Sequence, residues 1–112
     1  PADESPEELI RKANAAFYAG DSEAADPLYA AAAERTGDPG LVAFNRAAVL
    51  FQKGDFREAE LAYLRTLDDA AIPDERRAKA LFNRGVCLLK RDRSTGNLRT
   101  AIACFDLALT LE

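Results

Sequence analysis

Two copies of one short pattern decide the fold: Phe17-Tyr18-Ala19-Gly20-Asp21 and, 34 residues later, Phe51-Gln52-Lys53-Gly54-Asp55. Each copy places an aromatic residue shortly before a Gly-Asp pair. Glycine commonly ends a helix, and aspartate is a preferred cap for the start of the next one. A recurrence at this spacing predicts a chain built from similar units that stack side by side.

A third copy follows, with small insertions. Ala80-Leu81-Phe82-Asn83-Arg84-Gly85 repeats the pattern of Val42-Ala43-Phe44-Asn45-Arg46-Ala47 at a displacement of 38 residues. Small and aromatic residues then recur in the same order in all three copies: Ala25 and Tyr29, Ala59 and Tyr63, Ala101 and Phe105. We therefore expect one domain over residues 1–112, made of units at about residues 6–39, 40–73 and 74–111.

Each unit is predicted to form two helices joined by a turn. Ser5-Pro6-Glu7-Glu8 is a capping box with proline at the first helical position, and Asp38-Pro39 opens the third helix in the same way. Pro73-Asp74 opens the fifth. We expect a second capping box at Asp55-Phe56-Arg57-Glu58 for the fourth helix and an Asn97 cap for the sixth. No long segment alternates with period two, so the fold class is all-α, a helix-turn-helix repeat solenoid of six helices.

Pro27 lies inside the expected second helix, where proline removes a backbone hydrogen bond. Two interpretations are open: a helix that starts late with Asp26 as its cap, or a continuous helix with a mild kink. We favour the continuous helix because Ala25 and Tyr29 keep the register of the repeat.

The composition excludes several classes of function. The chain has 112 residues, a formal net charge of −4, two Cys and no His. Without histidine there is no Ser-His or Cys-His pair and no imidazole metal ligand. Cys87 and Cys104 are too far apart for a redox pair and are expected to be buried. We therefore expect no enzyme, no catalytic residue, no metal site and no cofactor. The net charge argues against nucleic acid as a partner, and no apolar stretch is long enough for membrane insertion.

The repeat resembles the tetratricopeptide repeat, a helix-turn-helix unit of about 34 residues. The resemblance covers roughly residues 6–111. It is carried by Leu9, Ala13, Gly20, Ala25, Tyr29 and Ala32, then by Ala47, Leu50, Gly54, Asp55, Phe56, Ala59 and Tyr63, and then by Leu81, Gly85, Leu88, Ala101, Phe105 and Ala108. The third unit departs from the pattern because the longer segment 92–97 replaces its turn. The resemblance implies a superhelix that holds a protein or peptide segment in a concave groove.

By the same resemblance, the first helix of each unit lines that groove. Six residues are our candidates for contact with a partner: Asn14, Phe44, Asn45, Lys79, Phe82 and Asn83. Asparagine amides can pair with a peptide backbone, and lysine can pair with a carboxylate. Three aromatic residues of the groove, Phe17, Phe51 and Phe82, have a second interpretation, which is packing of helix against helix.

Some tetratricopeptide co-chaperones hold the C-terminal carboxylate of a partner with two Lys, two Asn and an Arg. Asn14, Asn45 and Lys79 match three of these positions. Ile10 and Asn83 stand where the first Lys and the Arg would be. A free C-terminus and an internal segment therefore both stay open as ligands.

The last expected helix is apolar over several faces, with Ile102, Phe105, Leu107, Leu109 and Leu111. Another repeat or a second copy of the chain should cover it. The alternative function is therefore a self-assembling structural scaffold, a homodimer that pairs through this helix. Charge is also uneven, with 7 basic and 14 acidic side chains over residues 1–72 against 8 and 5 over residues 73–112, which would allow copies to stack head to tail.

The chain begins without Met and ends within an apolar helical pattern, which indicates a segment of a longer protein. Two free Cys agree with a reducing cytoplasm, the location that we favour. The lead-in over residues 74–83 is faintly similar to bacterial tetratricopeptide proteins of cell-envelope complexes. A periplasmic or cell-envelope location therefore stays open.

Overall fold

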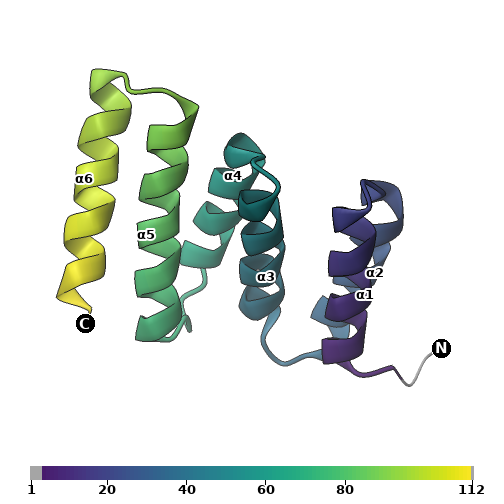
Figure 1. Cartoon of the computed structure of the whole chain (residues 1–112). Helices are drawn as coiled ribbons and strands as arrows, with labels where there is room; N and C mark the ends of the chain where they lie inside the picture. Colours follow the sequence, from purple (N-terminus) through teal and green to yellow (C-terminus); the bar gives the residue numbers. More distant parts are fainter. Residues whose placement is uncertain (1–3, 112) are drawn as a thin grey trace.

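The computed structural model describes residues 4–111, which form six helices and no strand (Figure 1). This confirms the predicted all-α class. None of the described helices is long and apolar enough to span a membrane. The helices are α1 (Pro6–Tyr18), α2 (Ser22–Arg35), α3 (Pro39–Gln52), α4 (Phe56–Leu67), α5 (Asp74–Arg91) and α6 (Thr95–Thr110).

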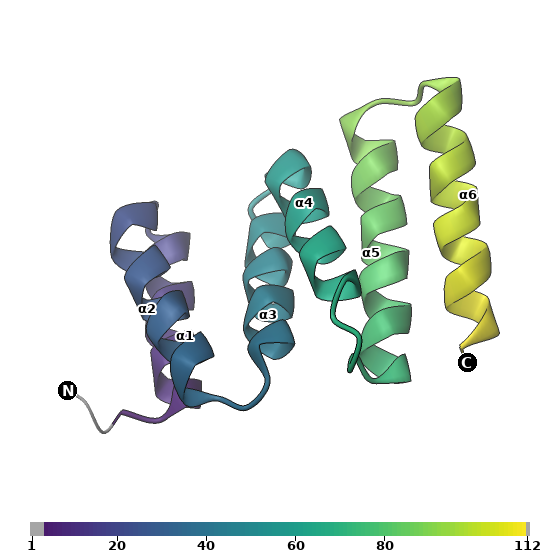
Figure 2. The same ribbon diagram turned by 180° about the vertical axis from the view of Figure 1, so that it is seen from behind.

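Consecutive helices form three antiparallel pairs that stand in a row, α1 with α2, α3 with α4 and α5 with α6 (Figures 1 and 2). Contacts also join α1 to α3 and α3 to α5, whereas in the described chain α2 makes none with α4 and α4 makes none with α6. The first helices of the pairs therefore lie closer together than the second helices. This is the arrangement of a curved helical solenoid. We call the side formed by α1, α3 and α5 the inner face.

The two Gly-Asp turns end one helix and begin the next, as predicted. Gly20 and Gly54 have positive φ values of 85° and 82°, a conformation that glycine adopts without strain. The Asp21 side chain caps α2 by accepting a hydrogen bond from the Ala24 amide. Asp55 is the cap residue of α4, but its side chain makes no capping hydrogen bond.

The predicted capping box at Asp55 is therefore wrong in its side chains, although the helix starts where expected. A capping box needs the backbone N–H of its first residue as a donor to the glutamate three positions on. The Asp55 N–H already donates to the Leu50 carbonyl at 3.0 Å, within the turn around Gly54. Glu58 thus has no backbone donor to accept from at this position.

Of the other predicted helix caps, two are confirmed and one is wrong. Ser5 and Asp38 accept hydrogen bonds from the amides three residues on, as predicted. The predicted Asn97 cap is wrong, because Ser94 caps α6 by accepting from the Asn97 amide at 3.2 Å. The Asn97 side chain instead donates to the carbonyls of Leu88 (3.1 Å) and Asp92 (3.3 Å). The Leu88 carbonyl also accepts from the Asp92 amide at 3.3 Å, so Asn97 adds a second hydrogen bond at the end of α5.

Pro27 lies within an uninterrupted α2, which confirms the continuous helix. The register of the repeat is kept on both sides of it, since Ala25 and Tyr29 are buried. Pro27 itself is exposed. The helical hydrogen bond that its nitrogen cannot donate is thus missing on a side of α2 that water can reach.

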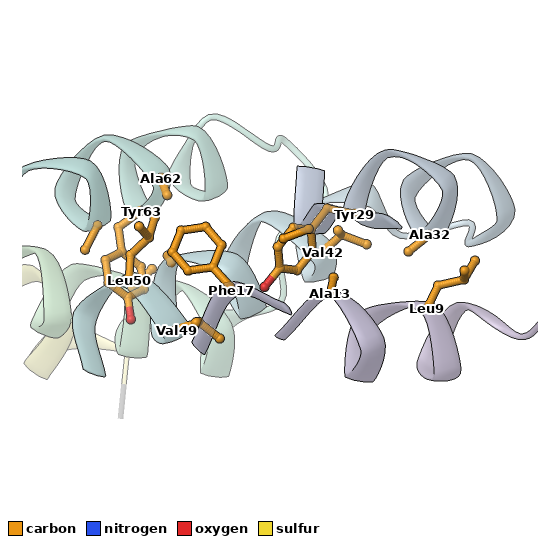
Figure 3. Close-up of a cluster of buried hydrophobic side chains, with 14 of the residues drawn as sticks. Leu9, Ala13, Phe17, Tyr29, Ala32, Val42, Val49, Leu50, Ala62 and Tyr63 are labelled. Atoms are coloured by element: carbon orange, nitrogen blue, oxygen red, sulfur yellow. The ribbon is translucent and has the colours of Figure 1, made fainter. Parts of the chain in front are cut away.

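The main core cluster runs from α1 to α5 and combines small residues with larger aliphatic and aromatic ones, and Figure 3 shows a part of it. The predicted small positions Ala13, Ala25, Ala47, Ala59, Gly85 and Ala101 are all buried. Gly85 is needed for close approach, because a Cβ atom built there would lie 2.6 Å from Cε1 of Phe105. Small residues at these places let the two helices of a pair come close together.

Cys87 and Cys104 are buried and free, as predicted. Burial raises the pKa of the Cys87 thiol to about 12, and it also raises the pKa of Cys104. Both thiols therefore stay protonated near neutral pH, which is the behaviour of small core residues rather than of reactive nucleophiles.

Candidate partner-binding face

All six candidate contact residues lie on the helices of the inner face. Four of them are partly buried, whereas Lys79 and Phe82 are exposed. They come from all three pairs of helices: Asn14 from α1, Phe44 and Asn45 from α3, and Lys79, Phe82 and Asn83 from α5.

Tyr63 of α4 connects two of these residues from neighbouring pairs. Its hydroxyl accepts a hydrogen bond of 3.0 Å from the side-chain amide of Asn83. Its ring lies edge-on to the ring of Phe44, with centroids 6.0 Å apart. Burial raises the pKa of Tyr63 to about 12, so the hydroxyl is protonated at neutral pH. The structure therefore brings Phe44 and Asn83 against one buried side chain.

A pocket of about 450 Å³ opens between α5 and α6. Phe82 is 53% exposed, and its ring centroid lies 5.3 Å from that of Phe105. The lining combines three candidate residues with four that the sequence analysis did not assign to the site: Lys79, Phe82 and Asn83, with Ala78, Phe105, Ala108 and Leu109.

The sequence indicates that two of the α6 residues in the pocket lining lie on one side of that helix. Phe105 and Leu109 are four residues apart, so both project from the same side of a helix. Both belong to the apolar surface predicted for the last helix, whereas the predicted groove lies on the first helices alone. The pocket therefore joins the predicted groove to the predicted apolar surface of the last helix.

The three asparagines differ in the hydrogen bonds that they already make. Asn14 accepts through Oδ1 from the Tyr29 hydroxyl at 2.5 Å, and Asn83 donates to Tyr63. Asn45 has no side-chain hydrogen bond to another described residue, and no fully buried side-chain polar atom of the described chain lacks a partner. The Asn45 amide is therefore reached by solvent, with its donors and acceptor available to a ligand.

Lys79 is paired with Glu75, one helical turn earlier, at 3.2 Å. The two side chains are 61% and 83% exposed. An exposed ion pair of this kind contributes little to stability, because water and salt screen it. Lys79 can therefore exchange Glu75 for a ligand carboxylate at small cost.

Two aromatic residues of the predicted groove are packing residues instead. Phe17 is buried, and the ammonium of Lys53 lies 4.9 Å from its ring centroid while donating to its carbonyl at 2.6 Å. Phe51 is half-buried and packs edge-on against Phe56 at 5.5 Å. The second interpretation is thus correct for these two. Phe82, which is half exposed, is different.

Acid–arginine pairs connect neighbouring pairs of helices. Asp26 of α2 lies 3.5 Å from Arg46 of α3. Glu60 of α4, which is buried, lies 3.3 Å from Arg84 of α5 and also contacts Arg91. The two acids are 34 residues apart and Arg46 and Arg84 are 38 apart, which are the displacements of the repeat. The same interaction therefore recurs at equivalent places.

Side chains for metal binding are not gathered in the part of the chain that the structure describes: no group of three His, Cys, Asp or Glu there could hold an ion. The six candidate residues on the inner face supply apolar rings, amides and one lysine. Such groups bind by burial and hydrogen bonding.

Comparison with known families agrees with this architecture. A family model described as "Tetratricopeptide repeat" matches residues 10–75 and again residues 44–111. The two matches begin 34 residues apart, which is the displacement of the Gly-Asp turns. A comparison with curated proteins finds no match. Tetratricopeptide repeats are in general non-catalytic modules that mediate protein–protein interactions. The chain belongs to the tetratricopeptide repeat family.

Proposed function

We propose that this chain is a protein–protein interaction module, without catalytic activity, that binds a peptide segment of a partner on its inner face. The observation that carries the proposal is the half-exposed Phe82 at an apolar pocket bordered by Asn83 and Lys79. A large aromatic side chain at such a pocket gains free energy when a ligand covers it. The proposed contact residues are Asn14, Phe44, Asn45, Lys79, Phe82 and Asn83.

Each part of this face has a chemical role in the proposal. The pocket beside Phe82 receives an apolar side chain of the peptide. The open amide of Asn45 pairs with a backbone N–H and C=O of the peptide and sets its register. The helices are formed before binding, so the cost of ordering falls on the peptide alone.

An internal segment is the ligand that the contacts favour over a free C-terminus. Lys79 is the single cation among the six residues, and Ile10 and Asn83 replace two cations of the carboxylate-binding pattern. The Asn14 oxygen is already bonded to the Tyr29 hydroxyl. A carboxylate would thus find one lysine and one open amide, fewer charged contacts than the pattern provides.

The second candidate function, a self-assembling scaffold, is favoured by a different observation. Ile102 and Leu109 on α6 are 58% and 65% exposed. Exposed apolar residues gathered on one helix indicate a surface that pairs with another protein surface. A scaffold of this kind would pair through α6 and leave the inner face unused.

The experiment is a selection of binders from random peptides displayed with free C-termini, followed by affinity measurements on the selected peptides with and without C-terminal amidation. We expect enriched peptides that carry apolar side chains and keep their affinity when amidated. Loss of binding on amidation would place a carboxylate at Lys79. No enrichment would contradict the peptide-binding function.

Matched variants show whether the selected peptides use the inner face. Phe82→Ala and Asn45→Ala should each weaken binding, by about tenfold for the aromatic anchor. Leu61→Ala is the control, since Leu61 is an exposed apolar residue on α4, outside the inner face. Equal loss in all three variants would contradict the assignment of the face.

A further inference from the structure

α6 carries an apolar stripe that α5 covers only at one edge, where the Phe105 ring lies 5.3 Å from that of Phe82. The stripe consists of Leu98, Ile102, Phe105 and Leu109, and its spacing of four, three and four residues keeps all of them on one side of a helix. The equivalent residues on α4, 42 positions earlier, are Phe56, Glu60, Tyr63 and Leu67, and α5 packs antiparallel against α4 there. The stripe is therefore where a further antiparallel helix would lie.

At one position the stripe has an apolar residue where α2 and α4 have an acidic one. Ile102 stands where α4 has Glu60 and α2 has Asp26. Both acids pair with an arginine of the next helix, Arg84 and Arg46. An isoleucine offers no partner to a cation. The helix that covers α6 must therefore present an apolar side chain at this place.

Head-to-tail stacking of copies does not meet this requirement. In such a stack α1 of the next copy would cover α6, and Lys12 is the α1 residue equivalent to Arg46, 34 positions earlier. Glu8 and Ala15 flank it on the same face, and all three are exposed. Lys12, which pairs with Glu4 of its own chain, would be pressed against Ile102, and Ile102 offers its ammonium no polar atom in exchange for the water that it loses.

We propose that a second copy of this chain covers the stripe, with the two α6 helices antiparallel about a twofold axis between Ile102 and Phe105. The spacing four-three-four reads the same in both directions. Leu98 therefore meets the partner's Leu109, and Ile102 meets the partner's Phe105. A surface that is complementary to itself in this way is what a symmetric dimer needs.

The charged residues beside the stripe also pair with one another when the two α6 helices are aligned in this antiparallel way. One flank is occupied by Ala101 and Ala108, which are buried in the described chain. The other flank carries Arg99 and Asp106, which are exposed and have no ion pair with another described residue. In the antiparallel pairing, Arg99 faces the partner's Asp106 twice, once on each side of the axis. Opposite charges at these flanking positions set the orientation of paired helices.

The first test is the mass of the 112-residue chain in solution, measured by sedimentation equilibrium over a wide range of concentration. We expect a dimer, with twice the chain's 12.2 kDa. Ile102→Asp should raise the dimer dissociation constant by about a hundredfold, because it buries a charge at the centre of the interface. Circular dichroism should show unchanged helix content, since Ile102 is 58% exposed.

Leu107→Asp is the matched control. Leu107 is on the same helix and is 55% exposed, but it lies on the side of α6 opposite the stripe. The variant should dimerise like the unaltered chain. A monomer at every concentration, an open-ended series of larger assemblies, or equal loss of dimer in both variants would overturn the proposal.

Charge reversal tests the register independently of the apolar residues. Arg99→Asp alone and Asp106→Arg alone each place like charges opposite one another and should weaken the dimer by about tenfold. The double variant restores both pairs and should restore the dimer. Failure of the double variant to dimerise better than the single ones would overturn the antiparallel pairing.

Phe105 and Leu109 belong to both the stripe and the peptide pocket, so a dimer would cover part of the pocket. Ile102 is not part of the pocket lining, so the monomeric Ile102→Asp variant should bind selected peptides at least as tightly as the unaltered chain. Absence of peptide binding in the monomeric Ile102→Asp variant would contradict the peptide-binding proposal alone, and peptide binding by a chain that never dimerises would contradict the dimer alone.

Discussion

The side-chain amide of Asn83 donates a hydrogen bond of 3.0 Å to the hydroxyl of Tyr63, across the boundary between α4 and α5. Asn45 and Tyr29 hold the equivalent places one unit earlier, but the Tyr29 hydroxyl donates to Asn14 in its own pair of helices. The same residue types are therefore used differently at two equivalent junctions. Asn83 connects neighbouring pairs of helices, whereas Asn45 keeps an open amide.

Replacing these two asparagines should separate their roles. Asn83→Ala should lower the free energy of unfolding by about 1 kcal/mol, because the buried Tyr63 hydroxyl loses its donor. Asn45→Ala should change it by less than about 0.5 kcal/mol, because no described side chain depends on its amide. Urea denaturation of both variants measures the difference. An equal loss for Asn45→Ala would show that Asn45 is a structural residue.

Gly85 and Gly96 give a pair of helical glycines with opposite expected effects. Gly85→Ala should destabilise the chain by about 1–3 kcal/mol, because its Cβ would lie 2.6 Å from the Phe105 ring and force it to move. Gly96 lies in the first turn of α6 with nothing within 4 Å of a built Cβ atom. Gly96→Ala should stabilise the chain by up to about 1 kcal/mol through helix propensity alone. Thermal denaturation of both variants checks the signs, and a stable Gly85→Ala variant would contradict the packing.

The buried acid of α4 should matter more than its exposed equivalent on α2. Glu60 has a side chain that is 7% exposed and contacts two arginines, so Glu60→Ala should cost about 2–3 kcal/mol of stability. The Asp26 side chain is 58% exposed, and Asp26→Ala should cost less than about 1 kcal/mol. Chemical denaturation at low and high salt measures both. Similar losses in the two variants would be inconsistent with the burial of Glu60.

The contact between α3 and α5 should weaken in acid. Two hydrogen bonds from the Arg76 guanidinium, at 2.9 and 2.7 Å, hold the pKa of Asp38 below its ordinary value of 3.8. A depressed pKa in the folded state stabilises the fold above the ordinary value, and this contribution is lost as pH falls through the lowered one. The stability difference between the unaltered chain and Asp38→Asn should thus be constant near neutral pH and shrink below about pH 4. A difference that grows on acidification would contradict the ion pair.

The helices and their order could be predicted from the sequence because their signals are local. Gly20, Gly54 and the caps at Ser5 and Asp38 act within a few residues of themselves. The predicted Asn97 cap is wrong, with Ser94 in its place, for the opposite reason. The Asn97 side-chain amide is taken by carbonyls at the end of α5, a contact that depends on how α6 packs.

The site was predictable only in part. The periodicity placed six residues on the first helices, and the structure has them on α1, α3 and α5. The asparagine amides of the site that already have hydrogen-bond partners bond to tyrosines on other helices. Tyr63, for example, is 20 residues from Asn83 in the sequence, so a local pattern does not predict the bond. The α6 wall of the pocket depends on the close approach of Phe105 to Gly85, which no local pattern expresses.

The most direct test of peptide binding on the inner face is a nuclear magnetic resonance titration of the isotope-labelled chain with the best selected peptide. We predict that chemical-shift changes concentrate on the backbone amides of α3 and α5 around Phe44, Lys79 and Phe82, and on the side-chain amide of Asn45. Changes confined to α2, α4 and the side of α6 around Leu107 would contradict the proposed function, because those surfaces lie away from the inner face.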